Sequence, residues 1–295
     1  MRNGTITKTL VAISIITVIV LVFFTVSQTA KSKSVPKVQS QDKKIKILIV
    51  AGHEPNAGGA DEFKSIKERD LNLRLAESLR DNLSRNTNLD IIMARDENGW
   101  NKDLKNYVMT SSTTIMSWVK DMKDKMMARV NTGEIKLINP DMKHNDATTS
   151  AVLFLYATNK WADENDVDLV INIHFNSNPK INGKPNYSGY CIYIPDNQYN
   201  NASSSRIFAN YLNEEIAKIE NPSTMPEEKK TIIEDQALIA IGNYDTLKIP
   251  TAVTEYAYMY ETKMLSTSTR NSFIEKAASS TATAIKNYIN SEMKK

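Results

Sequence analysis

Short apolar runs rich in β-branched residues alternate with longer amphipathic stretches over most of this chain. One run spans residues 45–51 and another spans 167–173. Runs of this length and composition are typical of strands that are buried on both faces of a sheet. Strands of that kind occur when helical connections cover the two faces, so the pattern predicts an α/β fold.

The rest of the chain from residue 45 continues this alternation. Leucines at four-residue spacing indicate a helix at about 67–84, because such residues share one helical face. The remaining helices are expected near 103–130, 147–164, 204–218, 234–241 and 273–289, and the remaining strands at 89–94, 190–194 and 252–256. We therefore predict three layers, a mixed sheet with helices on both faces.

The amino terminus carries a different signal. The apolar run Leu10–Val26 is just long enough to span a bilayer, and Arg2 and Lys8 precede it. We predict a transmembrane anchor over residues 1–27, with a cleaved signal peptide as the alternative. Residues 28–44 are polar and without periodicity, so they are expected to form a flexible linker. An anchor would place the globular part on the extracytoplasmic face of the membrane. A cleaved segment would leave it secreted or associated with the cell wall.

Composition excludes several classes of protein. With 41% hydrophobic and 24% charged residues the chain resembles an ordinary globular protein, and a net charge of +3 gives no reason to expect a nucleic-acid partner. Cys191 is the single cysteine. The chain therefore contains neither an internal disulfide nor a cysteine-rich zinc site.

Two histidines follow strand-like runs, His53 after the first and His174 after the run at 167–173. In α/β sheets ligands gather at the carboxyl ends of the strands, and neutral imidazole is a favoured zinc ligand. A catalytic zinc usually has three protein ligands. Glu68, at the start of the helix at 67–84, is the best candidate for the third. The alternative is that Glu68 only stabilises the positive end of that helix.

A further carboxylate, Glu255, ends the strand-like run that follows Pro250. A carboxylate at that edge can take a proton from an attacking water molecule and later give it to a leaving amine. The alternative interpretation is an exposed glutamate at a strand end.

Four segments in this order resemble the zinc-dependent N-acetylmuramoyl-L-alanine amidases, a bacterial cell-wall family with a phosphorylase/hydrolase-like fold. The segments are Gly52-His53, Lys67-Glu-Arg-Asp-Leu-Asn72, Ile173-His-Phe-Asn-Ser177, and Pro250 with Glu255 five residues on. The resemblance covers about residues 45–290. It implies one Zn²⁺ held by His53, Glu68 and His174, with Glu255 as the catalytic carboxylate. It also implies cleavage of the amide between the lactyl group of N-acetylmuramic acid and L-alanine in peptidoglycan.

The chain departs from that family at two places. Glu54 and Pro55 follow the first histidine, where such amidases usually have another glycine. After Glu255 the family often continues Thr-Gly-Phe, whereas this chain has Tyr256-Ala-Tyr258. These changes predict an altered loop beside the metal and, after the catalytic carboxylate, a subsite reshaped by two tyrosines. The tyrosines would either stack on a sugar or pack in the core.

Other polar residues near these segments are candidates for supporting roles. Asn176 is expected to shape the loop after the second histidine, and Asp61 and Asp70 are candidates for orienting a histidine ligand. His144 is expected to lie in a surface loop.

The predicted catalytic domain, residues 45–295, has helical inserts near 101–145 and 202–236. Such an insert is a candidate for a gate over the metal site or for a surface that binds a protein activator. Two functional alternatives stay open from the sequence. One is a zinc metallopeptidase that acts on the stem peptides of the wall, and the other is a wall-binding module without catalysis.

Overall fold

The computed structural model describes residues 43–55, 66–138, 147–177 and 187–293. Residues 44–295 form one compact unit. The predicted anchor over 1–27 and nearly all of the predicted linker lie outside the described residues, as do Asp61 and His144. Within the described ranges no helix combines the length and the apolar character needed to cross a membrane.

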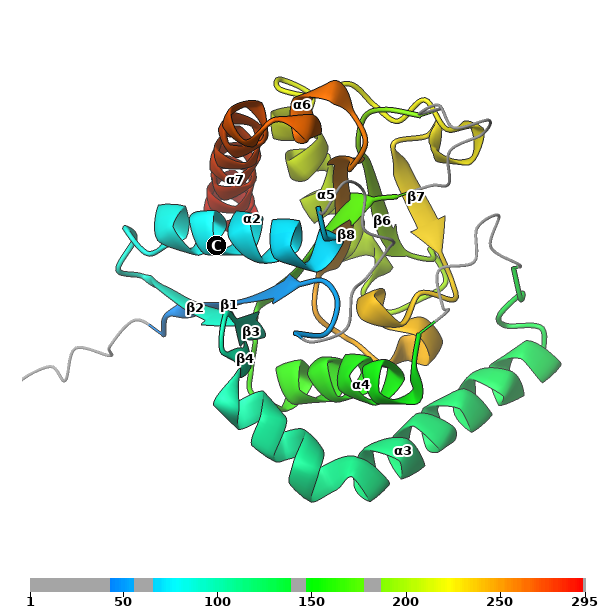
Figure 1. Cartoon of the computed structure of the whole chain (residues 1–295). Helices are drawn as coiled ribbons and strands as arrows, with labels where there is room; N and C mark the ends of the chain where they lie inside the picture. Colours follow the sequence, from blue (N-terminus) through cyan, green and yellow to red (C-terminus); the bar gives the residue numbers. More distant parts are fainter. Residues whose placement is uncertain (1–42, 56–65, 139–146, 178–186, 294–295) are drawn as a thin grey trace, which may run out of the picture. The chain divides into compact units, whose positions relative to one another are not determined.

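A six-stranded sheet in the order β2-β1-β5-β8-β6-β7 forms the centre of this unit (Figure 1). Four neighbouring strands, β2, β1, β5 and β8, are parallel, whereas β6 is antiparallel to β8 and parallel to β7. The expected α/β fold with a mixed, mostly parallel sheet is confirmed. The strands are β1 (Ile45–Ala51), β2 (Leu89–Met93), β5 (Leu169–Asn176), β6 (Cys191–Pro195), β7 (Ile232–Asp235) and β8 (Thr251–Tyr258).

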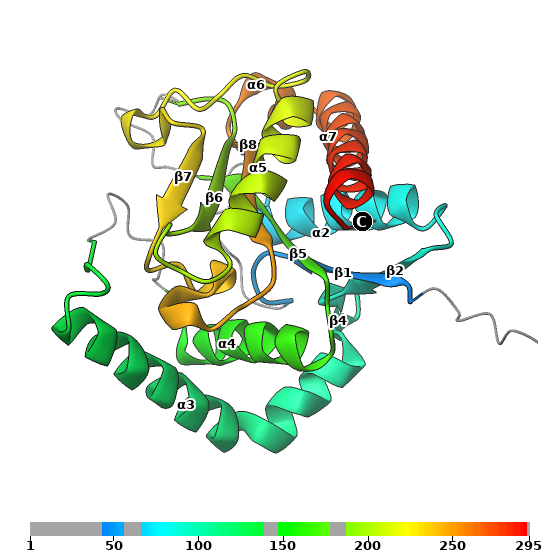
Figure 2. The same ribbon diagram turned by 180° about the vertical axis from the view of Figure 1, so that it is seen from behind.

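Helices cover both faces of the sheet, as Figures 1 and 2 show from opposite sides. Helices α2, α5 and α7 lie on one face, and α3 and α4 lie on the other. A short α6 precedes α7, and a small hairpin of β3 (Arg95–Asp96) and β4 (Gly99–Trp100) leads into α3. The helices are α2 (Glu68–Leu83), α3 (Lys102–Asn131), α4 (Thr149–Glu164), α5 (Ala202–Ile216), α6 (Thr262–Leu265) and α7 (Thr267–Tyr288).

Alternation along β1 explains why the two faces have separate cores. Ile47 and Ile49 pack into the cluster that includes α2, α5 and α7, whereas Leu48 and Val50 pack into the cluster that includes Trp161 of α4. Successive side chains of a strand point to opposite faces, so a continuous apolar run fills both cores. Because both faces of the sheet are packed against helices, the strands have fixed positions, and the candidate site is built near their carboxyl ends.

The expected helix at 234–241 is wrong. Those residues form the end of β7, a turn, and the 3₁₀ helix Ile239–Ile241. The Oδ1 atom of Asp235 accepts hydrogen bonds from the backbone N–H groups of Ala237 and Leu238, at 2.7 and 2.8 Å. A side chain that binds the following backbone in this way favours a turn over a helix.

Candidate active site

The structure brings the three predicted metal ligands together. Nε2 of His53 lies 2.8 Å from Oε2 of Glu68, and Nδ1 of His174 lies 2.9 Å from Oε1 of the same carboxylate. One ligand atom from each residue lies within 4.8 Å of the others. Two imidazoles and a carboxylate form the ligand set of many catalytic zinc sites.

Each ligand reaches this point from a different element. His53 comes two residues after β1 and has a φ of 68°, a left-handed conformation that histidine adopts more readily than most residues. Glu68 is the first residue of α2. His174 lies within β5, which continues to Asn176, so this histidine does not end its strand as the sequence suggested.

A glycine allows the two histidines to approach each other. A Cβ atom added at Gly52 would lie 2.3 Å from Cε1 and Nε2 of His174, closer than any carbon normally approaches. The two imidazole rings pack edge to face, with centroids 5.0 Å apart. Any side chain at position 52 would therefore displace a ligand.

Arg95 holds the end of β1 in place. This arginine is 2% exposed, and it donates hydrogen bonds to the carbonyl oxygens of Ala51, Gly52 and Arg69. Burial lowers the pKa of Arg95 to about 10, which leaves the guanidinium charged at neutral pH. Arg95 was not predicted as a residue of the site, although its position directly after the predicted strand at 89–94 could have indicated that it lies near the sheet edge.

Glu68 is ionised in its buried position. Burial alone would raise the pKa of Glu68, but the hydrogen bond to His174 and the contact with His53 outweigh it and hold this pKa well below the ordinary range. Phe175 N–H also donates to Oε1, at 3.3 Å. Burial lowers the pKa of His174, which favours its neutral, metal-binding form.

One further observation fits a metal at this point. Although His53 Nε2 is 2.8 Å from Glu68 Oε2, the pair lacks hydrogen-bond geometry, and this buried nitrogen has no hydrogen-bond partner among the described residues. Buried polar atoms are rarely left in that condition. A cation between the three side chains would satisfy it, so the residues fit a Zn²⁺ ion.

Glu255 lies beside the ligands. It is paired with His174 in the register of β8 and β5, so the two side chains point to the same face of the sheet. Its Oε2 atom is buried and has no hydrogen-bond partner in the described part of the chain. Burial, followed by the charges of Glu68 and Glu228, raises the pKa of Glu255 well above the usual value. A carboxyl whose pKa is raised in this way holds a proton more readily than an exposed glutamate does, which suits a group that accepts and returns a proton.

A pocket of about 210 Å³ joins these residues. Besides the predicted ligands and Glu255, its lining includes Tyr193 and the apolar residues Leu238, Ala240 and Val253. Asn176 lines the pocket as expected of a residue in that segment. The lining comprises His53, Glu68, His174, Phe175, Asn176, Ser177, Tyr193, Leu238, Ala240, Val253 and Glu255.

Asp70 does not take the role suggested for it. Its carboxylate is exposed and contacts Arg69, with 3.2 Å between Oδ1 and Nε. Asn72 is the buried polar neighbour of Glu68 instead, and its Nδ2 donates to the carbonyl oxygen of Gly52 at 3.3 Å. The position of Asp70, two residues after Glu68, predicted a polar group near that ligand. In the structure Asp70 lies on the face of α2 that points to solvent.

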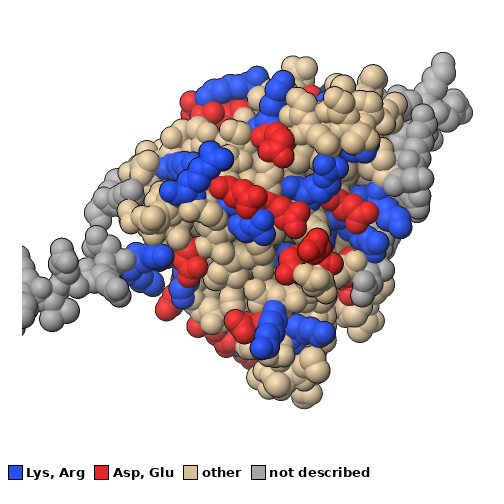
Figure 3. Space-filling model, turned by 60° about the vertical axis from the view of Figure 1, so that its left-hand side comes forward, with Lys and Arg blue, Asp and Glu red and all other residues tan. Residues whose placement is uncertain are grey.

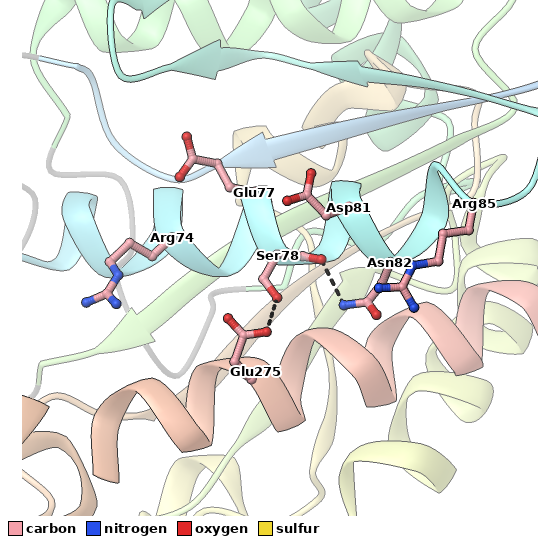
Figure 4. A pocket seen from close by; sticks show the side chains of 7 residues that line it. All are labelled: Arg74, Glu77, Ser78, Asp81, Asn82, Arg85 and Glu275. Atoms are coloured by element: carbon pink, nitrogen blue, oxygen red, sulfur yellow. Dashed lines mark hydrogen bonds between the residues drawn. The ribbon is translucent and has the colours of Figure 1, made fainter. Parts of the chain in front are cut away.

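A larger hollow of about 420 Å³ lies between α2 and α7 (Figure 4). Its side chains bond to one another, as Ser78 Oγ does to Glu275 at 2.8 Å. Its lining contains charges of both signs, Arg74 and Arg85 together with Glu77 and Asp81. Figure 3 shows the same intermixing of both charge signs over one face of the molecule. This hollow is a solvated seam between helices, and the smaller pocket contains the chemistry.

Comparison with known proteins agrees with this geometry. The family model described as N-acetylmuramoyl-L-alanine amidase matches residues 47–287. A search of curated protein sequences gave no significant match.

Similar folds occur in solved amidase structures. An N-acetylmuramoyl-L-alanine amidase from Clostridium difficile 630 is 16% identical with a TM-score of 0.51, covering 85% of this chain and 99% of that one. The CwlD amidase from Clostridioides difficile, solved in complex with the GerS lipoprotein, is 16% identical with a TM-score of 0.54, covering 84% and 99%. Ami1 from Mycobacterium smegmatis is 12% identical with a TM-score of 0.53, covering 86% and 100%. Because the family model spans most of the sequence, this chain belongs to the N-acetylmuramoyl-L-alanine amidase family.

Proposed function

We propose that this chain is a zinc-dependent hydrolase that cleaves the amide between N-acetylmuramic acid and L-alanine in peptidoglycan. The observation that carries the proposal is the position of Glu255. A buried carboxyl oxygen without a hydrogen-bond partner in the described residues lies beside two imidazoles and a carboxylate, in a pocket open to a ligand. Such an arrangement is costly for folding, and it is typical of a group kept for proton transfer.

His53, Glu68 and His174 are the residues that would hold the ion. Bound Zn²⁺ would polarise the scissile carbonyl and acidify a water molecule. Oε2 of Glu255 takes the proton of the attacking water and gives it to the nitrogen of the leaving L-alanine. Leu238, Ala240 and Val253 form an apolar wall that limits bulk water around these groups. The fold is expected to be of the phosphorylase/hydrolase-like type.

The substitution Glu255→Gln tests the proton-transfer role. Glutamine has nearly the same shape but does not accept a proton, so turnover should fall by about 10²–10⁴-fold, the usual contribution of general acid–base catalysis. Zinc content, measured by atomic absorption, should stay at one ion per chain in this variant. His53→Ala should lose the zinc as well as the activity. A Glu255→Gln variant that retains wild-type turnover would refute the assignment.

Two alternatives use the same pocket. A metallopeptidase would cut within the stem peptide, and a wall-binding module would bind without cutting. The buried oxygen of Glu255, which has no hydrogen-bond partner within the described ranges, counts against the second, because a binding module gains nothing from it. Mass analysis of the digestion products distinguishes the metallopeptidase from the amidase.

We further propose that residues 1–27 anchor the protein and place it on the extracytoplasmic face of the membrane, where its substrate lies. The apolar run Leu10–Val26 supports this. Removal of residues 1–27 should move the protein from the membrane fraction to the soluble fraction after cell lysis. Recovery of the intact chain in the soluble fraction would contradict the anchor.

A protein activator is also proposed, and the GerS complex of CwlD supports it by analogy. A gating insert is the second form of control. None of the described pocket residues comes from α3 or α5. Deletion of the insert near 101–145 or the one near 202–236 should raise hydrolysis of purified wall if that insert covers the site, and unchanged hydrolysis would exclude it.

A further inference from the structure

Glu228 is a fully buried carboxylate outside the metal site. It is the last residue of the 3₁₀ helix Pro226–Glu228, and its exposed fraction is 0%. Burial of an ionised carboxylate is costly unless hydrogen bonds replace the lost water. The residues that bond to Glu228 therefore show which part of the structure its burial supports.

Four neutral donors meet this carboxylate. Oε1 accepts hydrogen bonds from Asn176 Nδ2 at 2.9 Å and from Tyr193 OH at 3.0 Å. Oε2 accepts from Tyr258 OH at 2.8 Å and from Ser223 Oγ. Both oxygens are thus saturated by side chains from β5, β6, β8 and the segment before the 3₁₀ helix.

The two oxygens serve different groups. Asn176 and Tyr193, the partners of Oε1, line the active-site pocket. Ser223 and Tyr258, the partners of Oε2, do not line it and instead anchor the carboxylate itself. Oε1 accepts from the Asn176 amide nitrogen and from the Tyr193 hydroxyl, so it fixes which end of that amide faces it and where that hydroxyl points.

We propose that Glu228 is a positioning residue that holds Asn176 and Tyr193 in the pocket wall, so that substrate meets a preformed surface. The inference rests on the proposed function for its effect on substrate, but the hydrogen bonds themselves do not depend on it. Tyr258 lies in β8, the strand that carries Glu255, and its hydroxyl is what reaches Glu228.

The substitution Glu228→Gln tests the proposal, because glutamine keeps the shape but turns one acceptor into a donor. With a soluble N-acetylmuramoyl-peptide as substrate, KM should rise about tenfold, the effect of one lost hydrogen bond to a charged group, while kcat changes less. Tyr193→Phe should raise KM in the same direction. The double variant should show less than the product of the two effects, since both remove the same contact.

Matched controls separate positioning from general stability. Glu227→Gln changes the exposed neighbour and should change nothing. Ser223→Ala removes one of the two donors to Oε2, so it should lower the melting temperature and raise KM less than Glu228→Gln does.

Hydrogen–deuterium exchange gives a readout that does not need activity. Glu228→Gln should accelerate exchange in residues 170–177 and 190–195, and Glu227→Gln should not. A Glu228→Gln variant with wild-type KM and wild-type exchange would overturn the proposal. If the wild-type chain does not hydrolyse the substrate, the proposed function fails, and the exchange measurement still decides whether Glu228 positions the wall.

Discussion

Gly52 shows how much of this site depends on single residues. Its missing side chain leaves room for the His174 ring, which a Cβ atom would approach to 2.3 Å. Glu68 then joins both imidazoles through its two oxygens. Neither relation follows from the spacing of the residues along the chain. Both become visible only when β1, β5 and α2 are placed beside one another.

Gly52→Ala should weaken zinc binding by about 10–100-fold, the effect commonly seen when a residue that orients a ligand is changed. Competition with a fluorescent zinc chelator measures this affinity. Gly133→Ala is the control for backbone strain alone: its φ of 77° strains an alanine, but its Cβ atom would meet nothing within 4 Å, so zinc affinity should stay at the wild-type value. Equal zinc affinity in Gly52→Ala and wild type would show that the His174 ring moves without cost.

A second residue-scale prediction concerns pH. Burial raises the pKa of Glu255 above its unfolded value, so the neutral form stabilises the fold at low pH and this contribution is lost as pH rises toward the folded pKa. Glu255→Gln is always neutral. In the presence of a chelator its melting temperature should exceed that of wild type by a margin that grows above about pH 4.5. A margin that shrinks with rising pH would contradict the burial of Glu255.

At the level of helices and strands, Arg95 joins the end of β1 to the start of α2. Its guanidinium binds the carbonyl oxygens of Ala51, Gly52 and Arg69 at 2.7–2.9 Å. Arg95→Met should lower the free energy of unfolding by about 3 kcal/mol, because buried carbonyl groups lose charged donors. Urea denaturation measures the loss. Arg85→Met, at an exposed position, should change it by less than about 0.5 kcal/mol; equal losses would deny the role of Arg95.

The elements that could be predicted from sequence are those with a strong period. The apolar run at 45–51 and the leucines on one face of α2 follow the strand and helix patterns over the full length of those elements. The predicted bounds of both elements therefore agree with the structure to within about two residues. The helix expected at 234–241 failed because the Asp235 side chain binds the backbone after it. β3, β4 and β7 were missed, since strands of two to four residues show no period.

The same limit applies to the site. His53 follows a periodic segment and Glu68 begins one, whereas His174 and Glu255 lie inside β5 and β8 and do not end those strands as expected. The structure places all four around one pocket. Glu228 was not predicted as a site residue, because it lies in a charged stretch of sequence and such stretches are normally exposed to solvent. Its burial depends on donors from strands far away in the sequence, which no local pattern reveals.

For the molecule as a whole, the proposed metal site should couple zinc binding to stability. Zinc at 100 times its dissociation constant should add about 2.7 kcal/mol to the free energy of unfolding. Calorimetry with and without a chelator should therefore show a large drop in melting temperature for wild type. His53→Ala should show little difference between the two conditions. A wild-type melting temperature insensitive to the chelator would exclude zinc as a structural part of the unit.

The identity of the bond that is cut tests the central claim most directly. Purified peptidoglycan is digested with the wild-type chain, with the Glu255→Gln variant, and with wild type plus chelator, and the products are analysed by mass spectrometry. Wild type should release stem peptides with a free L-alanine amino terminus and leave glycan strands uncut, and the other two digests should not. New amino termini within the stem peptide, or release that continues in the chelator, would contradict a zinc-dependent amidase.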